Sequence, residues 1–418
     1  MSAERAPEER RRLTQAEVDL VCVKHDRLFR ARPGGARAVF AWADLSELDL
    51  SGRNLSDADF TGAVVAGCSF IKSRLDNAIF YGADLQNADL SEASLRRADL
   101  RGACLRGADL TGADLFESDL REGSIAAADA VKGLRILEPT KRASEAQGAI
   151  LIGANLERSK LSGVMAVRAD FTDAILKDAR LVRANLKQAT LHGANLSGAD
   201  LSGADLAGAD LRHAILVGAA LQSCAFDGAR MDGALTDTPS SRDVANLPYG
   251  EMLRDHALWC ETQGAEGKPS RFDDADLRAL GSIAGYNLTA LSAKGAVFYG
   301  LNMEGVQLQG AHMEGADLRN CNLKGADLRG ARLAHAKLSG ADLRHAHLGP
   351  LLIGQDRLFP SDLSGAMIKR ADLRGADLRR ALLTGANLSR SDFGGALVRE
   401  ADLLGAHLDG AKDLSPLA

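Results

Sequence analysis

Residues 83–110 read ADLQNADLSEASLRRADLRGACLRGADL, and this stretch decides the fold. A leucine recurs at every fifth position, and an alanine stands two positions before each leucine. The residue between them is Asp in most units, and polar residues or Gly follow the leucine. The stretch is therefore a tandem repeat whose unit is Ala-Asp-Leu-x-Gly.

The same period extends over most of the chain. Every fifth residue is apolar, without exception, in three runs: from Leu45 to Ile125, from Leu151 to Met231, and from Ile283 to Leu408. Only 46% of the whole chain is hydrophobic, so chance does not explain these runs. Self-similarity at a fixed period is the signature of a repeat architecture.

A period of five does not fit an α-helix, which has about 3.6 residues per turn. It fits a series of short strands, because Ala and Leu two positions apart face one side and the Asp between them faces the other. The Gly after each Leu lets the backbone turn a corner. Four units would close a four-sided turn of about 20 residues, and successive turns would stack about 4.8 Å apart by strand pairing. We predict columns of Leu and Ala inside this coil.

The units Ala83-Asp84-Leu85, Ala194-Asn195-Leu196 and Ala371-Asp372-Leu373 resemble the pentapeptide-repeat family, and the resemblance covers residues 45–231 and 283–408. It implies an all-β solenoid, a right-handed quadrilateral β-helix, here in two segments. It does not imply one function, because a fold hosts many roles.

Two segments outside the repeats have helical patterns. Residues 13–31 contain Thr14 and Glu17, spaced as a capping box. Residues 247–263 look like a second copy, since His256 precedes its repeat at nearly the spacing of His25. We expect a tandem duplication in which each short α-helix caps the N-terminal end of its solenoid, where unpaired strand edges otherwise favour aggregation.

The predicted organisation has four parts. They are an N-terminal tail with a capping helix (1–43), a first solenoid (44–237), a linker with the second capping helix (238–282), and a second solenoid (283–418).

Two interruptions break the repeats, at 126–149 and at 349–361, where we expect a short hairpin around Gly354. Long loops on a rigid frame often carry function, although tolerated insertions are the alternative. The candidate protein-contact residues are Lys132, Arg135, Lys141, Arg142, Gln355, Asp356, Arg357 and Phe359.

No arrangement typical of catalysis or metal binding is present in the sequence. Three cysteines, Cys68, Cys224 and Cys321, occupy the inward position of Ala, whereas Cys104 occupies the outward position of Asp. Cys22 near His25 and Cys260 near His256 give only two ligands each, too few for a zinc site. We expect no catalytic residue, no cofactor, no metal and no small-molecule substrate.

The histidines do not form a site either. If every turn of the coil has the same length, His347 and His407 lie on one face, three turns apart. That separation is too large for them to act together.

Composition bounds the remaining possibilities. The 418 residues carry a net charge of −5, so no global basic field suggests a nucleic-acid partner. No apolar run approaches the length of about 18 residues needed for a membrane span. The first residues lack the apolar region of a secretory signal, and six cysteines without paired spacing fit a reducing compartment, so we expect a cytoplasmic protein.

Three functions compete. The first is a non-enzymatic scaffold that binds an unknown protein partner. The second, implied by the best-understood members of the family, is DNA mimicry that protects gyrase from fluoroquinolones. It requires a strongly acidic surface, whereas residues 44–237 carry a net charge of −7 and residues 283–418 one of +2. The third is a partner of a bacterial secretion or signalling system. A homodimer through the C-terminal turn, at Leu408 and Leu414, is a further option.

Overall fold

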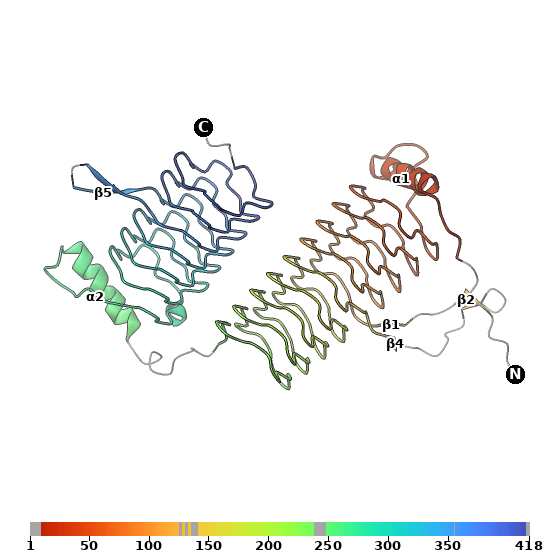
Figure 1. Ribbon diagram of the computed structural model, residues 1–418, viewed down its shortest axis with the longest axis horizontal. Coiled ribbons are helices and arrows are strands. Elements are labelled where there is room, and N and C mark those ends of the chain that lie inside the picture. The colour runs from red at the N-terminus through yellow and green to blue at the C-terminus, as the bar shows by residue number, and fades with distance from the viewer. Residues whose placement is uncertain are drawn as a thin grey trace. The chain divides into compact units, whose positions relative to one another are not determined.

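The computed structural model describes residues 10–124, 128–129, 133–134, 141–237, 248–354 and 356–414. Its contacts divide the chain into two compact units, Met1–Thr238 and Pro239–Ala418, called here the first and the second unit. In each unit the chain winds as a stack of similar coils (Figure 1).

A ladder of parallel backbone pairs holds the coils together. In the first unit Asp59 pairs with Ile79 and Ile79 with Asp99, and the same increment in residue number recurs through both units. The Phe60 N–H donates to the carbonyl of Ile79 at 2.7 Å, and the Ile79 N–H donates to the carbonyl of Ala58 at 2.9 Å. Because the repeat has a period of five and the ladder advances by 20, four repeats make one turn. The predicted β-helix solenoid is confirmed.

Each corner of the coil is a β-turn with a defined backbone requirement. The Ala88 N–H donates to the carbonyl of Leu85 at 3.1 Å, and the third residue of this turn, Asn87, has a φ of +54°. A positive φ at that position suits Gly and Asn. The carboxylate of Asp89 accepts the N–H of Ser91, two residues later, at 2.9 Å. The recurrent Asp therefore stabilises the turn that follows it.

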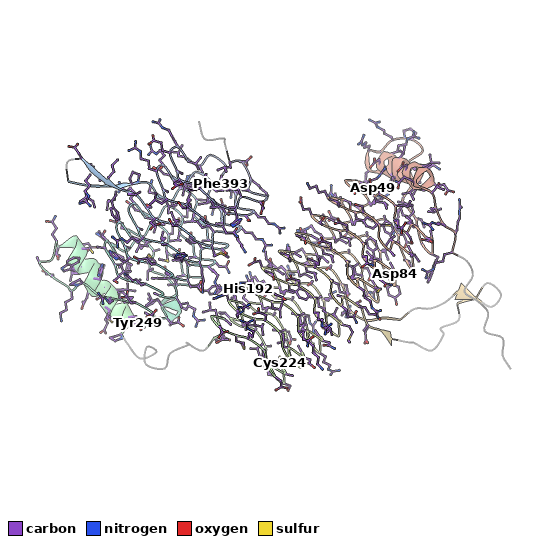
Figure 2. All side chains as sticks on the ribbon, viewed as in Figure 1. Asp49, Asp84, His192, Cys224, Tyr249 and Phe393 are labelled. Atoms are coloured by element: carbon purple, nitrogen blue, oxygen red, sulfur yellow. The ribbon has the colours of Figure 1, made fainter. Side chains whose placement is uncertain are left out.

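The interior is filled as the repeat predicts. The Leu columns and most of the Ala columns are fully buried, and each unit has its own apolar cluster. In the first unit Phe40, Phe60 and Phe80 stack in one column, with ring centroids 5.1 and 4.6 Å apart. In Figure 2 two labelled side chains illustrate the difference between core and wall: Phe393 is buried, whereas Asp84 is only partly covered.

Helix α1 (Gln15–Phe29) begins at the predicted capping box. Thr14 accepts the N–H of Glu17, and the Glu17 carboxylate accepts the N–H of Thr14. Val18 of α1 belongs to the apolar cluster of the first unit. Arg53, which stands where most repeats have Ala, reaches Asp19 of the helix at 2.6 Å. The helix therefore packs against the apolar cluster of the first unit and is tied to it by this ion pair.

Helix α2 (Tyr249–Glu261) makes the corresponding contacts in the second unit, although Pro248 supplies no side-chain cap. Its Leu253 belongs to the second apolar cluster. His256 accepts the N–H of Ser270 on Nδ1 at 3.1 Å, and His25 accepts the N–H of Ala38 on Nδ1 at 3.0 Å. A short 3-10 helix, η1 (Arg278–Leu280), follows before the coils begin.

The first interruption both begins and ends earlier than the predicted 126–149, since Gly123 is already part of it and the ladder resumes at Glu145. Strands β1 (Gly123–Ser124) and β4 (Lys141–Arg142) pair at its base, and β2 (Ala128–Asp129) pairs with β3 (Gly133–Leu134). The ladder then resumes with Cys104 opposite Glu145, about twice the regular increment in residue number. The core column restarts at Ala146, one repeat before Leu151, because Ala fills the inward position as well as Leu does.

The second interruption contains the predicted hairpin, formed by β5 (Leu351–Ile353) and β6 (Arg357–Phe359). The ladder goes here from Arg332 to Asp362, one and a half times the regular increment. The added residues project as the hairpin and do not wind around the coil, so the residue numbers beyond them are offset from the regular count. His347 pairs with Asp377, while His407 pairs with Asn387 in another column. The expectation that His347 and His407 share a face is therefore wrong.

The Leu column sets the stability of the coils. We expect Leu328→Arg to lower the free energy of unfolding of the second unit by about 3–5 kcal/mol, because it buries an unpaired charge. Leu328 is 0% exposed. Urea unfolding followed by the fluorescence of Trp259, in a Trp42→Phe background, measures the change. The exposed Leu352→Arg is the control, and equal midpoints for both variants would contradict the inward placement of Leu328.

Stability should also depend on pH through the two helix histidines. Burial lowers the pKa of His25 and of His256, although Asp26 and Asp57 raise that of His25 and Arg37 adds to its lowering. Because the unfolded-state pKa is about 6.5, the unfolded chain binds more protons below that pH. The stabilisation is fully present above about pH 6.5 and is lost as pH falls through the lower folded-state pKa values.

We therefore expect the melting temperature to fall between pH 7 and pH 5, and the double variant His25→Asn/His256→Asn to lose most of this dependence. Differential scanning calorimetry across this range measures it. A melting temperature of the unaltered protein that stays constant over the range would show that protonation of these imidazoles does not loosen the helices.

Candidate protein-interaction surface

The β5–β6 hairpin is held against the coils that precede it. Leu351 lies so close to Gly330 that a Cβ on that glycine would stand 2.7 Å from the Cβ of Leu351. The guanidinium of Arg332 lies 5.6 Å from the ring centre of Phe359, which pairs with Leu351 across the hairpin. One face of the hairpin is therefore docked, and Phe359, a predicted contact residue, is partly used for docking.

The other face of the hairpin is apolar and exposed. Leu352 and Leu358 form a cross-strand pair, and their exposed fractions are 58% and 44%. Ile353, at the tip, is 48% exposed. Of the predicted contact residues, Asp356 and Arg357 are exposed, while Gln355 lies outside the described residues. Exposed apolar groups gathered on one projecting element mark an interaction site more often than scattered ones do.

At the point where the chain re-enters the coil after each interruption, a buried serine forms hydrogen bonds with the preceding coil. Neither serine was identified from the sequence. Ser361 accepts the N–H of Gly330 at 3.0 Å, and its hydroxyl lies 3.0 Å from the carbonyls of Leu328 and Gly349. Ser144 accepts the N–H of Gly102 at 2.9 Å in the same way. Both occupy the inward position usually held by Ala, which is the sequence signal that could have located them.

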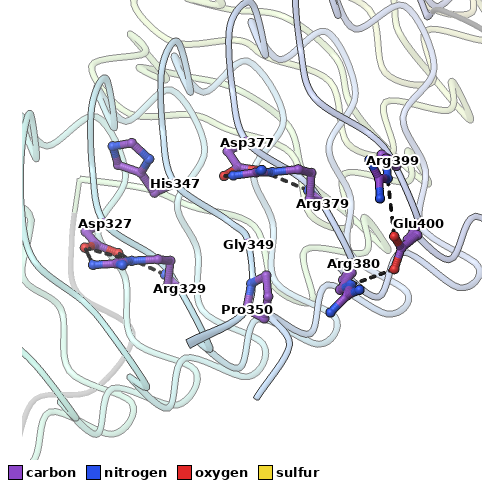
Figure 3. Close-up of a pocket in the computed structure, with 10 residues that line it drawn as sticks. All are labelled: Asp327, Arg329, His347, Gly349, Pro350, Asp377, Arg379, Arg380, Arg399 and Glu400. Atoms are coloured by element: carbon purple, nitrogen blue, oxygen red, sulfur yellow. Dashed lines mark hydrogen bonds and ion pairs between the residues drawn. The ribbon is translucent and has the colours of Figure 1, made fainter. Parts of the chain in front are cut away.

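A charged groove adjoins the root of the hairpin, with a cavity volume of about 640 Å³ (Figure 3). Its floor follows the column that runs from Asp327 through His347 to Asp377. The lining residues are Asp327, Arg329, His347, Gly349, Pro350, Asp377, Arg379, Arg380, Arg399 and Glu400. Gly349 and Pro350 belong to the chain entering the hairpin, so the groove reaches the root of the hairpin.

The acids of the groove are held by its arginines. Arg379 donates through Nε and Nη2 to the two carboxylate oxygens of Asp377, at 2.9 and 2.8 Å. These bonds hold the pKa of the Asp377 carboxyl below its usual range. Arg329 forms the same fork on Asp327.

The two remaining arginines of the groove share one acid. Arg380 and Arg399 donate to opposite oxygens of Glu400, at 2.6 and 3.3 Å. Four guanidinium groups thus face three carboxylates in this groove.

The contact residues predicted in the first interruption belong to the first unit, whereas the hairpin and the groove belong to the second. Lys141 and Arg142 form β4, opposite Ser124 and Gly123, in the first unit. Lys132 and Arg135 lie outside the described residues. The eight candidate residues therefore divide between the two units.

The contacts of two cysteines show how the wall of the coil uses them. The thiol of Cys68 donates to the carbonyl of Leu45 at 2.8 Å, and burial raises its pKa to about 11. Cys104 does not point to solvent as expected: it is buried, and its Sγ lies 3.8 Å from Glu145, which is ion-paired with Arg106. Among the described residues, no three side chains of the metal-binding types lie together.

Neither described α-helix has the length and hydropathy that a membrane crossing requires.

A family model described as "Pentapeptide repeats (8 copies)" matches the chain. The matched residues are 38–77, 54–91, 78–121, 145–178, 167–203, 179–218, 204–235, 311–349, 361–385 and 386–414. No curated protein matches the chain.

Several solved structures are similar to the chain. HetL, a pentapeptide repeat protein of the cyanobacterium Nostoc involved in regulating heterocyst differentiation, is 24% identical, with 91% of this chain and 95% of HetL covered and a TM-score of 0.19. Rfr23, a pentapeptide repeat protein of the cyanobacterium Cyanothece, is 29% identical, with coverages of 33% and 91% and a TM-score of 0.25. QnrB1, a plasmid-mediated fluoroquinolone resistance protein, is 18% identical, with coverages of 47% and 94% and a TM-score of 0.29.

The serine at the return of the hairpin provides a test of how the insertion is held. We expect Ser361→Ala to reduce the free energy of unfolding of the second unit by about 1–3 kcal/mol, since it leaves buried backbone groups poorly satisfied. Urea unfolding followed by Trp259 fluorescence measures the effect. Ser389→Ala, at a partly exposed corner, is the matched control. A loss no larger than that of the control would mean that the Ser361 bonds do not hold the hairpin root.

Proposed function

Because the chain belongs to the pentapeptide-repeat family, whose model matches more than half of its residues, we propose that it is a non-enzymatic scaffold that binds a partner protein through the β5–β6 hairpin and the adjoining groove. The observation that carries this proposal is the hairpin itself. It projects an exposed Leu352–Leu358 pair from a coil whose other apolar side chains are largely buried. A rigid frame with one projecting apolar element is a typical arrangement for protein recognition.

The absence of enzymatic activity is part of the proposal. It is supported by the roles that the described side chains already have. The Asp residues accept turn N–H groups, as Asp89 does from Ser91, or hold Arg forks, as Asp377 does. The inward thiol of Cys68 is poorly acidic.

The structural part of the proposal concerns the ends and hand of the coils. We propose that α1 and α2 cap the N-terminal ends of right-handed solenoids, with domain boundaries near 43, 237 and 282. Support comes from Val18 and Leu253, which join the apolar clusters of their units. A homodimer through the C-terminal turn stays a prediction, as does a cytoplasmic location. Leu408 and Leu414 are half-buried in the described part of that turn.

DNA mimicry of the gyrase-binding kind is less well supported. The acidic side chains of the first unit are interspersed with arginines that pair with them, such as Arg121 with Asp119 at 2.7 Å. A continuous acidic surface requires acids without such partners. A partner in a secretion or signalling system agrees with the scaffold proposal but has no specific observation in its favour.

The ladder allows the hairpin to be removed without breaking the repeat. Deleting residues 351–360 leaves Leu348 and Leu363 five positions apart, as in every regular repeat. Pro350→Gly must accompany the deletion, because the corresponding corner has a φ of +66° at Gly330 and +57° at Arg380. A matched variant deletes residues 123–143, which places Leu120 and Ala146 five positions apart.

We expect both deletion variants to fold, and the hairpin deletion to reduce capture of the native partner at least tenfold in a quantitative affinity capture from the source cells. The deletion of residues 123–143 measures how much the first interruption contributes to capture of the partner. Capture that survives removal of both insertions would place the contact on a face of the solenoid and overturn the proposal.

A further inference from the structure

The groove beside the hairpin points to the chemistry of the partner. Resting on the function proposed above, we infer that the partner presents an acidic segment with apolar side chains, whose carboxylates bind the arginines of the groove while its apolar groups cover Leu352 and Leu358.

The arginines of the groove keep hydrogen-bond donors that its acids do not use. A guanidinium has about five N–H donors, and a fork on a carboxylate uses two of them. Arg379 donates to Asp377 through Nε and Nη2, so both hydrogens of Nη1 stay available. Arg329 is left in the same condition by its fork on Asp327. A carboxylate has about four acceptor sites, and these acids have fewer left: Asp377 also accepts the N–H of Arg379, and Asp327 also accepts the N–H of Arg329 and the side chain of Gln309. The groove therefore offers donors rather than acceptors, which suits an anionic ligand.

The guanidinium groups of the groove outnumber its carboxylates. Arg380 and Arg399 share the carboxylate of Glu400. Outside the lining of the groove, Arg357 on β6 and Arg332 beside Phe359 add two further guanidinium groups at the hairpin, and Asp356 is the acid nearest to Arg357 in the chain. A carboxylate-bearing segment would balance this surplus.

Exposed leucines stand near the groove, on the hairpin and on the coil. Leu352 and Leu358 stand on the hairpin face opposite Leu351, which packs on the preceding coils. Leu397 pairs with Asp377 in the backbone ladder, one turn further along, and its side chain is 50% exposed. Arginines flanked by exposed leucines fit a segment in which acidic and apolar residues alternate. A nucleic-acid backbone offers no apolar group to cover the leucines. Its phosphates would also be repelled by the carboxylates of Asp327, Asp377 and Glu400.

The ladder supplies a matched control variant. Arg374 forms the same fork on Asp372, in an identical Ala-Asp-Leu-Arg repeat, at 2.6 Å. Asp372 belongs to another column, opposite Asp342, so this fork is not part of the groove. Arg374→Gln and Arg379→Gln therefore remove the same charge from the same kind of fork at two positions. Asp372 keeps a second arginine, Arg344, at 3.6 Å, and Arg374 also lies 3.9 Å from Asp392.

The test is fluorescence anisotropy of the full chain with three labelled peptides of equal length. The first places Leu at every third or fourth position among Glu, the second replaces Glu by Gln, and the third replaces Leu by Ser. We expect the Glu/Leu peptide to bind best, at least fivefold more weakly to Arg379→Gln, and within twofold of the unaltered protein to Arg374→Gln. The double variant Leu352→Ser/Leu358→Ser should weaken this peptide but not the Glu/Ser peptide.

Three results would overturn the inference: equal binding of the Gln peptide, equal losses in Arg374→Gln and Arg379→Gln, or tighter binding of a labelled DNA duplex that Arg379→Gln abolishes. This test is separate from that of the proposed function. If the hairpin deletion abolishes partner capture while the Glu/Leu peptide does not bind, the scaffold function stands and the acidic chemistry is wrong. If the deletion leaves capture unchanged, the proposed function itself fails.

Discussion

The parallel backbone ladder between residues one turn apart is the constraint on which the rest of the structure depends. Each face contributes one short pair, such as Asp59 with Ile79, so no single strand is long enough to be stable by itself. Stability comes from repeating the pair on four sides and filling the narrow interior with Leu and Ala. Each coil needs its neighbour, as in other repeat architectures, and in each unit a residue of the helix, Val18 or Leu253, joins the same apolar cluster.

This constraint decides where the chain can carry anything beyond the frame. An insertion has to leave and re-enter at a corner, so that the ladder closes above and below it, as it does between Arg332 and Asp362. At both interruptions a buried serine, Ser144 or Ser361, ties the returning chain to the coil before the insertion. The hairpin therefore projects from a frame to which hydrogen bonds tie its root. Such an arrangement lowers the loss of conformational entropy when a partner binds.

Much of the fold could be predicted from the sequence, because inward and outward positions alternate within each repeat and Leu328 or Ala88 can only face inward. The errors have physical causes. The end of the first interruption was predicted too late because Ala146 fills a core position that the pattern reserves for large apolar residues. Cys104 was predicted to be exposed, but the ion pair of Arg106 with Glu145 lies beside it.

The candidate site could be predicted only in part. The hairpin followed from the broken pattern around Gly354, yet the groove did not. Its column joins Asp327, His347 and Asp377, and the step in residue number from His347 to Asp377 is larger because the hairpin residues lie between them in the chain. A ladder of constant step would separate Arg329 from Arg379, so the arginine cluster is invisible until the length of the insertion within the ladder is known.

The central claim is that the partner contacts the hairpin and not a flat face of the coil. Photo-crosslinking in the source cells tests it most directly, with p-benzoylphenylalanine placed at position 352 or, for comparison, at the partly exposed position 152 of the first unit. A discrete protein adduct from position 352, with none from position 152, is the expected result. An adduct of the same protein from position 152, with none from position 352, would contradict the account.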